Sequence, residues 1–121
     1  MPQTITLTVE ELEDTAHIGR VVMVDSALTI TGGAVFICDA SAGAFALTLP
    51  AAGALEDITE KNDGRILIIK KKDSSANAIT VTRAGSDTID GATTYVLSAQ
   101  YDSVTLVDDS DGNAWNIIAT T

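Results

Sequence analysis

Alternation of apolar and small polar residues is the feature that most constrains the fold of this chain. In Thr4–Val9 the apolar residues Ile5, Leu7 and Val9 stand at every second position, with threonines between them. A period of two places successive side chains on opposite faces of a β-strand. The same pattern recurs in three further segments: Ala44–Leu49, Ala78–Thr82 and Ser103–Val107. We interpret these segments as half-buried antiparallel strands, each with one apolar face toward a core.

A few segments depart from this alternation. Ile66–Ile69 is continuously apolar, which predicts a strand covered on both faces. Thr8–Glu11 fits a capping box, with a threonine N-cap and a glutamate three residues later, and predicts one short N-terminal helix that ends before Gly19. A second brief helix is expected within Gly53–Lys61. Both are short, and the expected class remains all-β.

A turn-like segment occurs three times, each time directly before an alternating strand. Each copy begins with Asp, has Gly or Asn at its fifth position and Ala at its sixth: Asp39–Leu47, Asp73–Val81 and Asp109–Ile117. The copies lie about 34 and 36 residues apart, which is a spacing typical of internal repeats. A truncated relative is Asp25–Ile30. Because Asp bonds to the backbone two residues on, and Gly or Asn accepts the left-handed conformation, we expect each copy to be the tip of a β-hairpin.

The 121 residues are enough for one domain. We expect a compact antiparallel sandwich or barrel of short strands and hairpins, in which residues 37–121 form a repeated-hairpin module and residues 1–36 include a docking segment. A small all-β domain exposes edge strands whose backbone groups must be paired, covered or charged. Symmetric assembly into a homotrimer would bury such edges.

The charge of the chain argues against several classes of partner. The formal net charge is -10, from 17 acidic and 7 basic residues, so nucleic acid and anionic membranes would be repelled. The one basic run, Lys70–Lys72, is interpreted as a solvated strand end rather than an anion site. The N-terminus has no secretory pattern and no apolar run is long enough to span a bilayer, so we expect a chain made in the cytoplasm.

Residues that could carry chemistry are few. The only histidine, His17, has no matching nucleophile motif, and the only cysteine, Cys38, is expected to be a small buried hydrophobe. Acidic pairs such as Asp87 with Asp90 are expected by chance in so acidic a chain. The segment Asp108–Asn113 suggests calcium binding, but it lacks the EF-hand spacing and is interpreted as a polar turn. We therefore predict no enzyme activity and no catalytic, cofactor or metal-binding residues.

The aromatic residues could build a sugar-binding platform or a core. Phe45 and Trp115 occupy equivalent positions after the first and third turns, so we expect them in the core. Tyr95 and Tyr101 flank a turn and are better candidates for exposure, and the sequence leaves open whether they bind a ligand.

Residues 39–119 resemble a β-rich module of tailed-bacteriophage structural proteins. The resemblance rests on Ile68–Val81 and on Gly85–Ala92 with its Asp-Thr-Ile-Asp-Gly-Ala stretch. It continues with Tyr95, Leu97, Gln100–Val104 with its Tyr-Asp-Ser-Val stretch, and Asp111–Asn113 with Trp115. Such modules occur in head fibres, capsid decoration proteins and tail fibres, usually as trimers. The shared residues are of turn and strand type, so no functional residue is transferred.

This resemblance implies a virion structural protein. The first expectation is a capsid decoration or head-fibre protein that binds the major capsid protein, or another virion component, as a homotrimer. The alternative is a tail-fibre module that binds a receptor or a host surface glycan.

Overall fold

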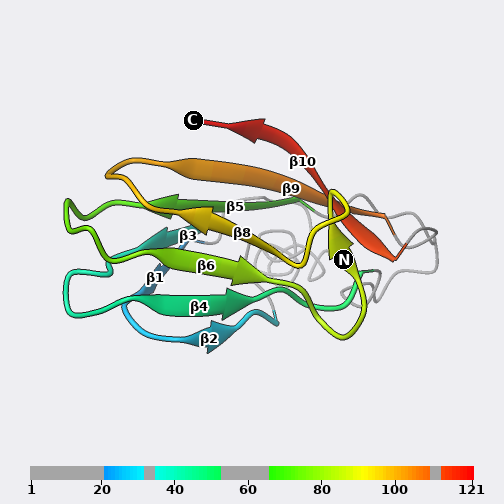
Figure 1. Ribbon diagram of the computed structural model, residues 1–121, viewed down its shortest axis with the longest axis horizontal. Helices are drawn as coiled ribbons and strands as arrows, with labels where there is room; N and C mark the ends of the chain where they lie inside the picture. The colour runs from blue at the N-terminus through cyan, green and yellow to red at the C-terminus, as the bar shows by residue number, and fades with distance from the viewer. Residues whose placement is uncertain (1–20, 32–34, 53–65, 110–112) are drawn as a thin grey trace, which may run out of the picture.

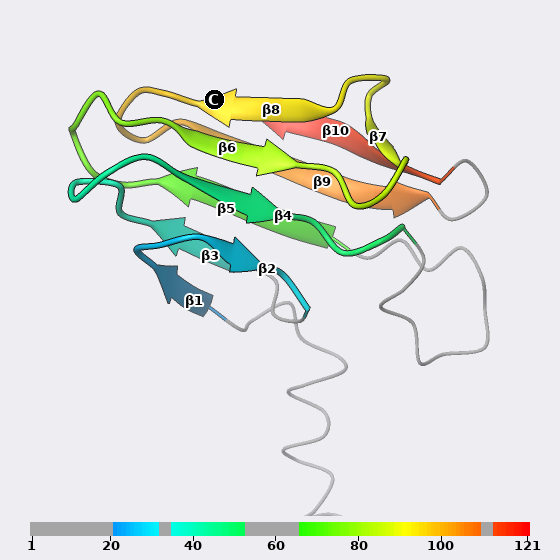
Figure 2. The same ribbon diagram turned by 60° about the horizontal axis from the view of Figure 1, so that its bottom comes forward.

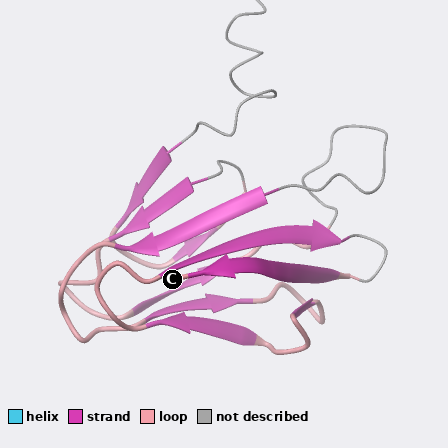
Figure 3. Ribbon diagram, turned by 90° about the horizontal axis from the view of Figure 1, so that it is seen from above, coloured by secondary structure: helices cyan, strands magenta, loops and turns pink. Residues whose placement is uncertain are grey.

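The computed structural model describes residues 21–31, 35–52, 66–109 and 113–121. Within these ranges the chain forms strands and loops without a helix (Figures 1 and 3). The strands are β1 (Val21–Val24), β2 (Leu28–Thr29), β3 (Val35–Cys38), β4 (Phe45–Thr48), β5 (Ile66–Lys71), β6 (Ile79–Thr82), β7 (Thr88–Ile89), β8 (Thr94–Leu97), β9 (Ser103–Asp109) and β10 (Ala114–Thr120). The all-β class is therefore confirmed for the described part of the chain.

The strands form two mixed sheets that lie in two layers (Figure 2). Sheet A has the order β1-β3-β5-β9-β10-β7, and sheet B has the order β2-β4-β6-β8. From β1 to β6 the chain passes from one sheet to the other at every step, so that β1, β3 and β5 are parallel neighbours in sheet A and β2, β4 and β6 in sheet B.

The expected antiparallel arrangement is wrong for most of the described pairings. Five of the eight pairs are parallel, and only β5 with β9, β9 with β10 and β6 with β8 are antiparallel. Alternation could not reveal this, because side chains change face at every residue in both kinds of pair. Parallel neighbours need a crossover connection, and each parallel pair in the first six strands is joined through a connection that includes a strand of the opposite sheet.

The expectation of hairpin tips is wrong for the first two turn copies and for the truncated one. Residues 39–44 and 72–78 carry the chain from sheet A to sheet B, and so do residues 25–27. Only the third copy joins consecutive strands that pair antiparallel, β9 and β10. The turn residues fix a tight change of direction, but residues 72–78 are longer than the 2–5 residues usual for a hairpin loop. Loop length does not explain the crossing at residues 25–27, which is short enough for a hairpin. In all three cases the outgoing strand has a parallel neighbour in sheet B and does not pair with the strand before it.

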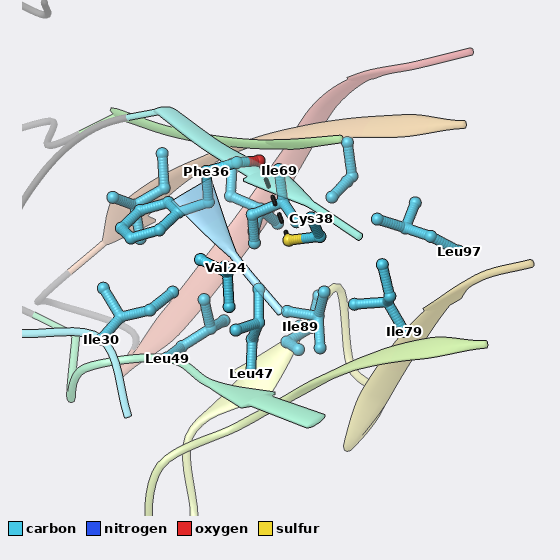
Figure 4. Packing of buried hydrophobic residues seen from close by; sticks show 14 of the residues in the cluster. Val24, Ile30, Phe36, Cys38, Leu47, Leu49, Ile69, Ile79, Ile89 and Leu97 are labelled. Carbon is cyan, nitrogen blue, oxygen red and sulfur yellow. Dashed lines mark hydrogen bonds between the residues drawn. The ribbon is translucent and has the colours of Figure 1, made fainter. Parts of the chain in front are cut away.

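One apolar cluster fills the space between the sheets (Figure 4). Phe36, Cys38 and Ile69 of sheet A face Leu47 and Ile79 of sheet B in this view, and all five are at most 1% exposed. They occupy the inward positions of alternating strands, so the sequence pattern and the burial agree. Full burial of an aliphatic side chain contributes about 1.5–3 kcal/mol, which makes this cluster the main stabilising term.

The structure describes only some of the other segments for which the sequence made a prediction. Ile66–Ile69 lies in β5 as expected, with Leu67 and Ile69 in the core, but Ile66 and Ile68 on the other face are only half-buried. Strands β1 and β2 and the start of β3 lie within residues 1–36, so this part of the expected docking segment belongs to the two sheets. The strand at Thr4–Val9 and both predicted helices, Thr8–Gly19 and Gly53–Lys61, lie outside the described residues.

Trp115 closes the core near the end of β4. It is 0% exposed, and its indole Nε1–H donates to the carbonyl oxygen of Pro50 over 3.0 Å. The expectation that Trp115 is a core residue is confirmed. Phe45, at the equivalent position of the first turn copy, is half-buried against the same cluster.

We predict that Trp115→Phe lowers the free energy of unfolding by about 1–3 kcal/mol, because it leaves the buried Pro50 carbonyl without its donor. The smaller ring adds a further loss through the space it leaves. The measurement is urea unfolding followed by far-UV circular dichroism, with Tyr101→Phe as a control at an exposed aromatic, where the change should stay within about 0.5 kcal/mol. Equal stability of the two variants would contradict this account of Trp115.

Candidate functional site

The turns that leave β3 and β5 stack on one another at one end of the molecule, at the left in Figure 1. Backbone hydrogen bonds continue the parallel register into the turns: Asp39 N donates to Val24 O over 2.8 Å, and Lys72 N donates to Cys38 O over 2.8 Å. On the far side of the turns, Phe45 N donates to Ala78 O over 3.3 Å. We call Ala40, Lys71, Asp73, Ser75 and Asn77, which hold these turns together, the turn cluster.

Lys71 is the centre of the turn cluster. Residues of β5 alternate in burial, so Lys71 follows Leu67 and Ile69 on the inward face and is 0% exposed. Its Nζ donates to Asp73 Oδ2 over 2.8 Å, to Ser75 O over 2.9 Å and to Asp73 O over 3.2 Å. An ammonium group has three hydrogens, so these contacts use all of its donors.

Lys71 corrects the interpretation of Lys70–Lys72 as a solvated strand end. Lys72 is exposed and Lys70 is half-buried, but the middle lysine is buried in an ion pair. The signal that could have found it was present in the sequence. Lys71 has the same parity as Leu67 and Ile69, so a strand that runs through it places its side chain on the core side.

Asp73 accepts hydrogen bonds from both turns. Besides Lys71 Nζ, its carboxylate accepts from Ala40 N over 2.7 Å, from Ser75 N over 3.0 Å and from the Ser75 hydroxyl. Desolvation acts to raise the pKa of Asp73, but the hydrogen bonds from Lys71 and Ser75, and then from Ala40, outweigh it and hold the pKa well below its usual range. The side chain is 7% exposed, and the ion pair with Lys71 compensates for its burial.

The carbonyl of Ala40 completes the link between the turns. It accepts from Asn77 Nδ2 over 2.8 Å and lies 3.3 Å from the Ser75 hydroxyl. Asp39 caps its own turn, since its Oδ1 accepts from Ser41 N over 2.9 Å. The hydrogen bonds from Ser41 lower the pKa of Asp39. In the first two turn copies, the shared aspartates Asp39 and Asp73, together with Asn77, thus bond within a turn or between turns.

Cys38 lies directly under the turn cluster. It is 0% exposed, and its Sγ donates to Phe36 O over 3.9 Å. Burial, and then the nearby charge of Asp73, raise the pKa of Cys38 to about 12. The thiol is therefore protonated at neutral pH and is a poor nucleophile. The expectation of a small buried hydrophobe is confirmed for Cys38.

The turn cluster is built to hold backbone rather than to react. The lysine donors and the carboxylate oxygens are engaged with each other and with main-chain groups, so a substrate would have to displace structural bonds. Among the described residues there is no group of three or more His, Cys, Asp or Glu side chains that could hold a metal ion.

A second turn at the same end contains the Tyr-Asp-Ser-Val stretch. Asp102 Oδ2 accepts from Ser98 N over 3.2 Å and from Ala99 N over 3.0 Å. Tyr101 has a positive φ of 73° and donates its N–H to Lys71 O over 2.7 Å, while Lys71 N donates to Asp102 O over 2.9 Å. This turn therefore fastens to the residue that carries the buried ammonium.

The aspartates of the Asp-Thr-Ile-Asp-Gly-Ala stretch, around β7, also accept hydrogen bonds from backbone N–H groups. Asp87 Oδ2 accepts from Ala52 N over 2.8 Å, and Asp90 Oδ1 accepts from Ile117 N over 3.1 Å. The two carboxylates thus bond to backbone groups of distant segments. Left-handed φ values at Asp90 and at Gly91 bend the chain directly after β7.

The remaining candidate residues are dispersed. Tyr95 is half-buried against the core, whereas Tyr101 is 60% exposed with Lys70 Nζ 5.2 Å from its ring centroid, so the two tyrosines differ in burial and surroundings. Asp108 is buried and Asp109 half-buried at the end of β9. His17 and residues 110–112 of the acidic turn lie outside the described residues.

Comparison with family models and with curated proteins identifies no relative of this chain. No protein-family model matches the chain, and no curated protein matches it significantly. Across the described ranges, the structure contains no helix long and apolar enough to cross a membrane.

We predict that Asp73→Asn destabilises the protein at neutral pH and flattens its response to acid. The folded state holds the pKa of Asp73 below its usual value of 3.8, so the ionised carboxylate stabilises the folded protein at pH values above 3.8. This stabilisation is lost as the pH falls below 3.8 toward the lowered pKa. The variant should therefore approach the wild type in stability as the solution becomes more acidic. Urea unfolding over a series of pH values measures this.

The matched control is Asp25→Asn, at the exposed first position of the truncated turn copy. It should leave the acid limb of the stability curve unchanged. If the stability of Asp73→Asn falls with acid as steeply as that of the wild type, the role given to this carboxylate is contradicted.

Proposed function

We propose that this chain is a structural protein of a tailed-bacteriophage virion, and that it acts as a capsid decoration or head-fibre protein in the form of a homotrimer. In this proposal the two sheets form a sandwich that assembles through the outer face or the edge of a sheet. The proposal rests on the resemblance of residues 39–119 to phage β modules and on the use that the fold makes of the resembling residues.

The observation that carries the proposal is the bonding of the resembling stretches. Asp73, Asp87, Asp90 and Asp102 each accept hydrogen bonds from backbone N–H groups. Carboxylates committed in this way support a rigid scaffold, as expected of a module whose shared residues are architectural. A particle component with a repeated, rigid shape needs such a scaffold and needs no reactive site.

The placement of acidic residues in the turns, at the ends of the strands, also supports a role on the surface of a particle. In the described strands, acidic side chains occur only at Asp108 and Asp109, whereas the turns contain six further aspartates: Asp25, Asp39, Asp73, Asp87, Asp90 and Asp102. Net negative charge keeps a protein soluble and limits unspecific association. Binding would then depend on the uncharged strand faces or on residues outside the described ranges.

The competing proposal is a tail-fibre module that binds a host glycan. One observation favours it, the exposure of the Tyr101 ring at a turn. Sugar-binding sites usually combine an exposed ring with neighbouring polar groups in a hollow. Tyr95 does not join Tyr101 in such a platform, since it packs against the core, and we therefore place this function second.

The proposal predicts that the purified protein has three times the single-chain mass of 12.5 kDa and binds saturably to phage heads that lack it. Light scattering gives the mass, and co-sedimentation with such heads gives the binding. Heads that already carry the protein serve as the control and should bind little more. If the purified protein is a monomer that does not bind the heads but is retarded on a column of host glycan, the proposal is overturned in favour of the tail-fibre function.

A further inference from the structure

The outer face of sheet A over β1, β3 and β5 differs in chemistry from the outer face of sheet B. In sheet B the outward positions form a row of threonines across all four strands, Thr29, Thr48, Thr82 and Thr94, which are paired in register. A second row runs through Ala46, Thr80 and Val96. Hydroxyl side chains on an outward face are compatible with water, as expected for a sheet with one solvated side.

In sheet A the corresponding positions of β1, β3 and β5 carry aliphatic residues, and on β9 the rows continue with the polar residues Thr105 and Ser103. The outward rows of sheet A begin with Val21, Val35 and Ile68, and with Met23 and Ile37, each paired in register across β1, β3 and β5. We call Val21, Met23, Val35, Ile37, Ile66 and Ile68 the aliphatic face. The contrast with the threonine rows arises at equivalent strand positions, so alternation alone does not explain it.

The exposure of the aliphatic face increases toward the edge of the sheet. Val21 and Met23 on β1 are 58% and 62% exposed, whereas the four residues on β3 and β5 are half-buried. Among the described strands β1 has a hydrogen-bonded neighbour on one side only, which is β3. An apolar edge strand of this kind needs to be covered, because it offers both backbone groups and aliphatic surface to another chain.

We propose that the aliphatic face, centred on Val21 and Met23, is the surface through which copies of this chain associate. The inference rests on the proposed homotrimer and deepens it by assigning the surface. The occupant is a second copy of the chain, since the proposed homotrimer requires a contact between copies, and the charge of the chain restricts where that contact can lie. Each copy has a net charge of -10, so two copies repel one another unless they meet where carboxylates are absent.

The aliphatic face satisfies this condition. None of its six residues is charged, and the one charged residue at an outward position of β1, β3 or β5 is Lys70, which is next to Ile37 in register. The aspartates described above lie in the turns at the two ends of the strands and at the end of β9. Within the described part of the chain, contact through β1 and β3 therefore buries aliphatic surface, while the acidic side chains lie in the turns and at the end of β9.

The test compares one charge change on the two outer faces. Met23→Glu places a carboxylate in the aliphatic face, and Val96→Glu places the same group on the outer face of sheet B at a position that is 49% exposed. Mass is measured by light scattering over a range of protein concentrations. We expect Met23→Glu to fall to the single-chain mass of 12.5 kDa and Val96→Glu to keep the mass of the wild type.

A second variant guards against misfolding. Val21→Thr combined with Met23→Thr gives this edge the residue type that the outer face of sheet B already carries, without adding charge. It should keep a wild-type far-UV circular dichroism spectrum and raise the dissociation constant of the oligomer at least about tenfold, because less apolar surface is buried on association.

The outcomes separate this inference from the proposed function. If the wild type is oligomeric and both the Met23→Glu and the double-threonine variant keep its mass, or if Val96→Glu dissociates in the same way, the assigned surface is wrong while the homotrimer stands. A wild type that is a single chain at every concentration overturns self-association and leaves the aliphatic face to another segment or partner. If that single chain still binds phage heads, the virion role survives without the trimer.

Discussion

The buried ion pair between Lys71 and Asp73 is the interaction on which the arrangement of the turns depends. A buried ammonium is costly unless it is paired and hydrogen-bonded, and here Asp73 and the backbone of Ser75 meet that demand. Once Asp73 is held, its other oxygen accepts from Ala40 N in the neighbouring turn. One charged pair thereby fixes the position of two chain reversals that are far apart in the sequence.

The alignment of these two turns sets the register of β4 and β6, the strands that follow them. Phe45 pairs with Ile79 and Leu47 with Val81, which are the same matches that the repeated turn segment suggests. Because a shift by one residue would turn the apolar side chains of β4 outward, the register decides whether the core forms. We infer that the charged pair contributes specificity of alignment, while the apolar cluster between the sheets contributes most of the stability.

Much of the strand content could be predicted from the sequence, but the way the strands pair could not. Alternation located β4, β6 and β9, and the apolar run located β5. The choice between parallel and antiparallel pairs depends on contacts between distant segments, and a period of two is the same in both. The Asp, Gly and Asn residues of the turns likewise marked where the chain reverses, without showing that the reversal leads into the opposite sheet.

The turn cluster was hidden for a related reason. A run of three lysines has the composition of a solvated surface, and only the strand position of Lys71 relative to Ile69 distinguishes it from its neighbours. The aliphatic outer face of sheet A was partly visible in Ile66–Ile69, which was expected to be covered on both sides. Its extent across β1 and β3 became visible only through the parallel register.

The most direct test of the central claim compares Lys71→Met with Lys72→Met by urea unfolding at neutral pH. Both variants replace one lysine by an apolar side chain of similar length, but only Lys71 is buried against a carboxylate. Removing one partner of a buried pair is strongly destabilising, because the other charge stays behind without compensation. The account predicts a loss of stability in Lys71→Met several times that in Lys72→Met, which should be close to the wild type. Equal unfolding midpoints for the two variants would contradict it.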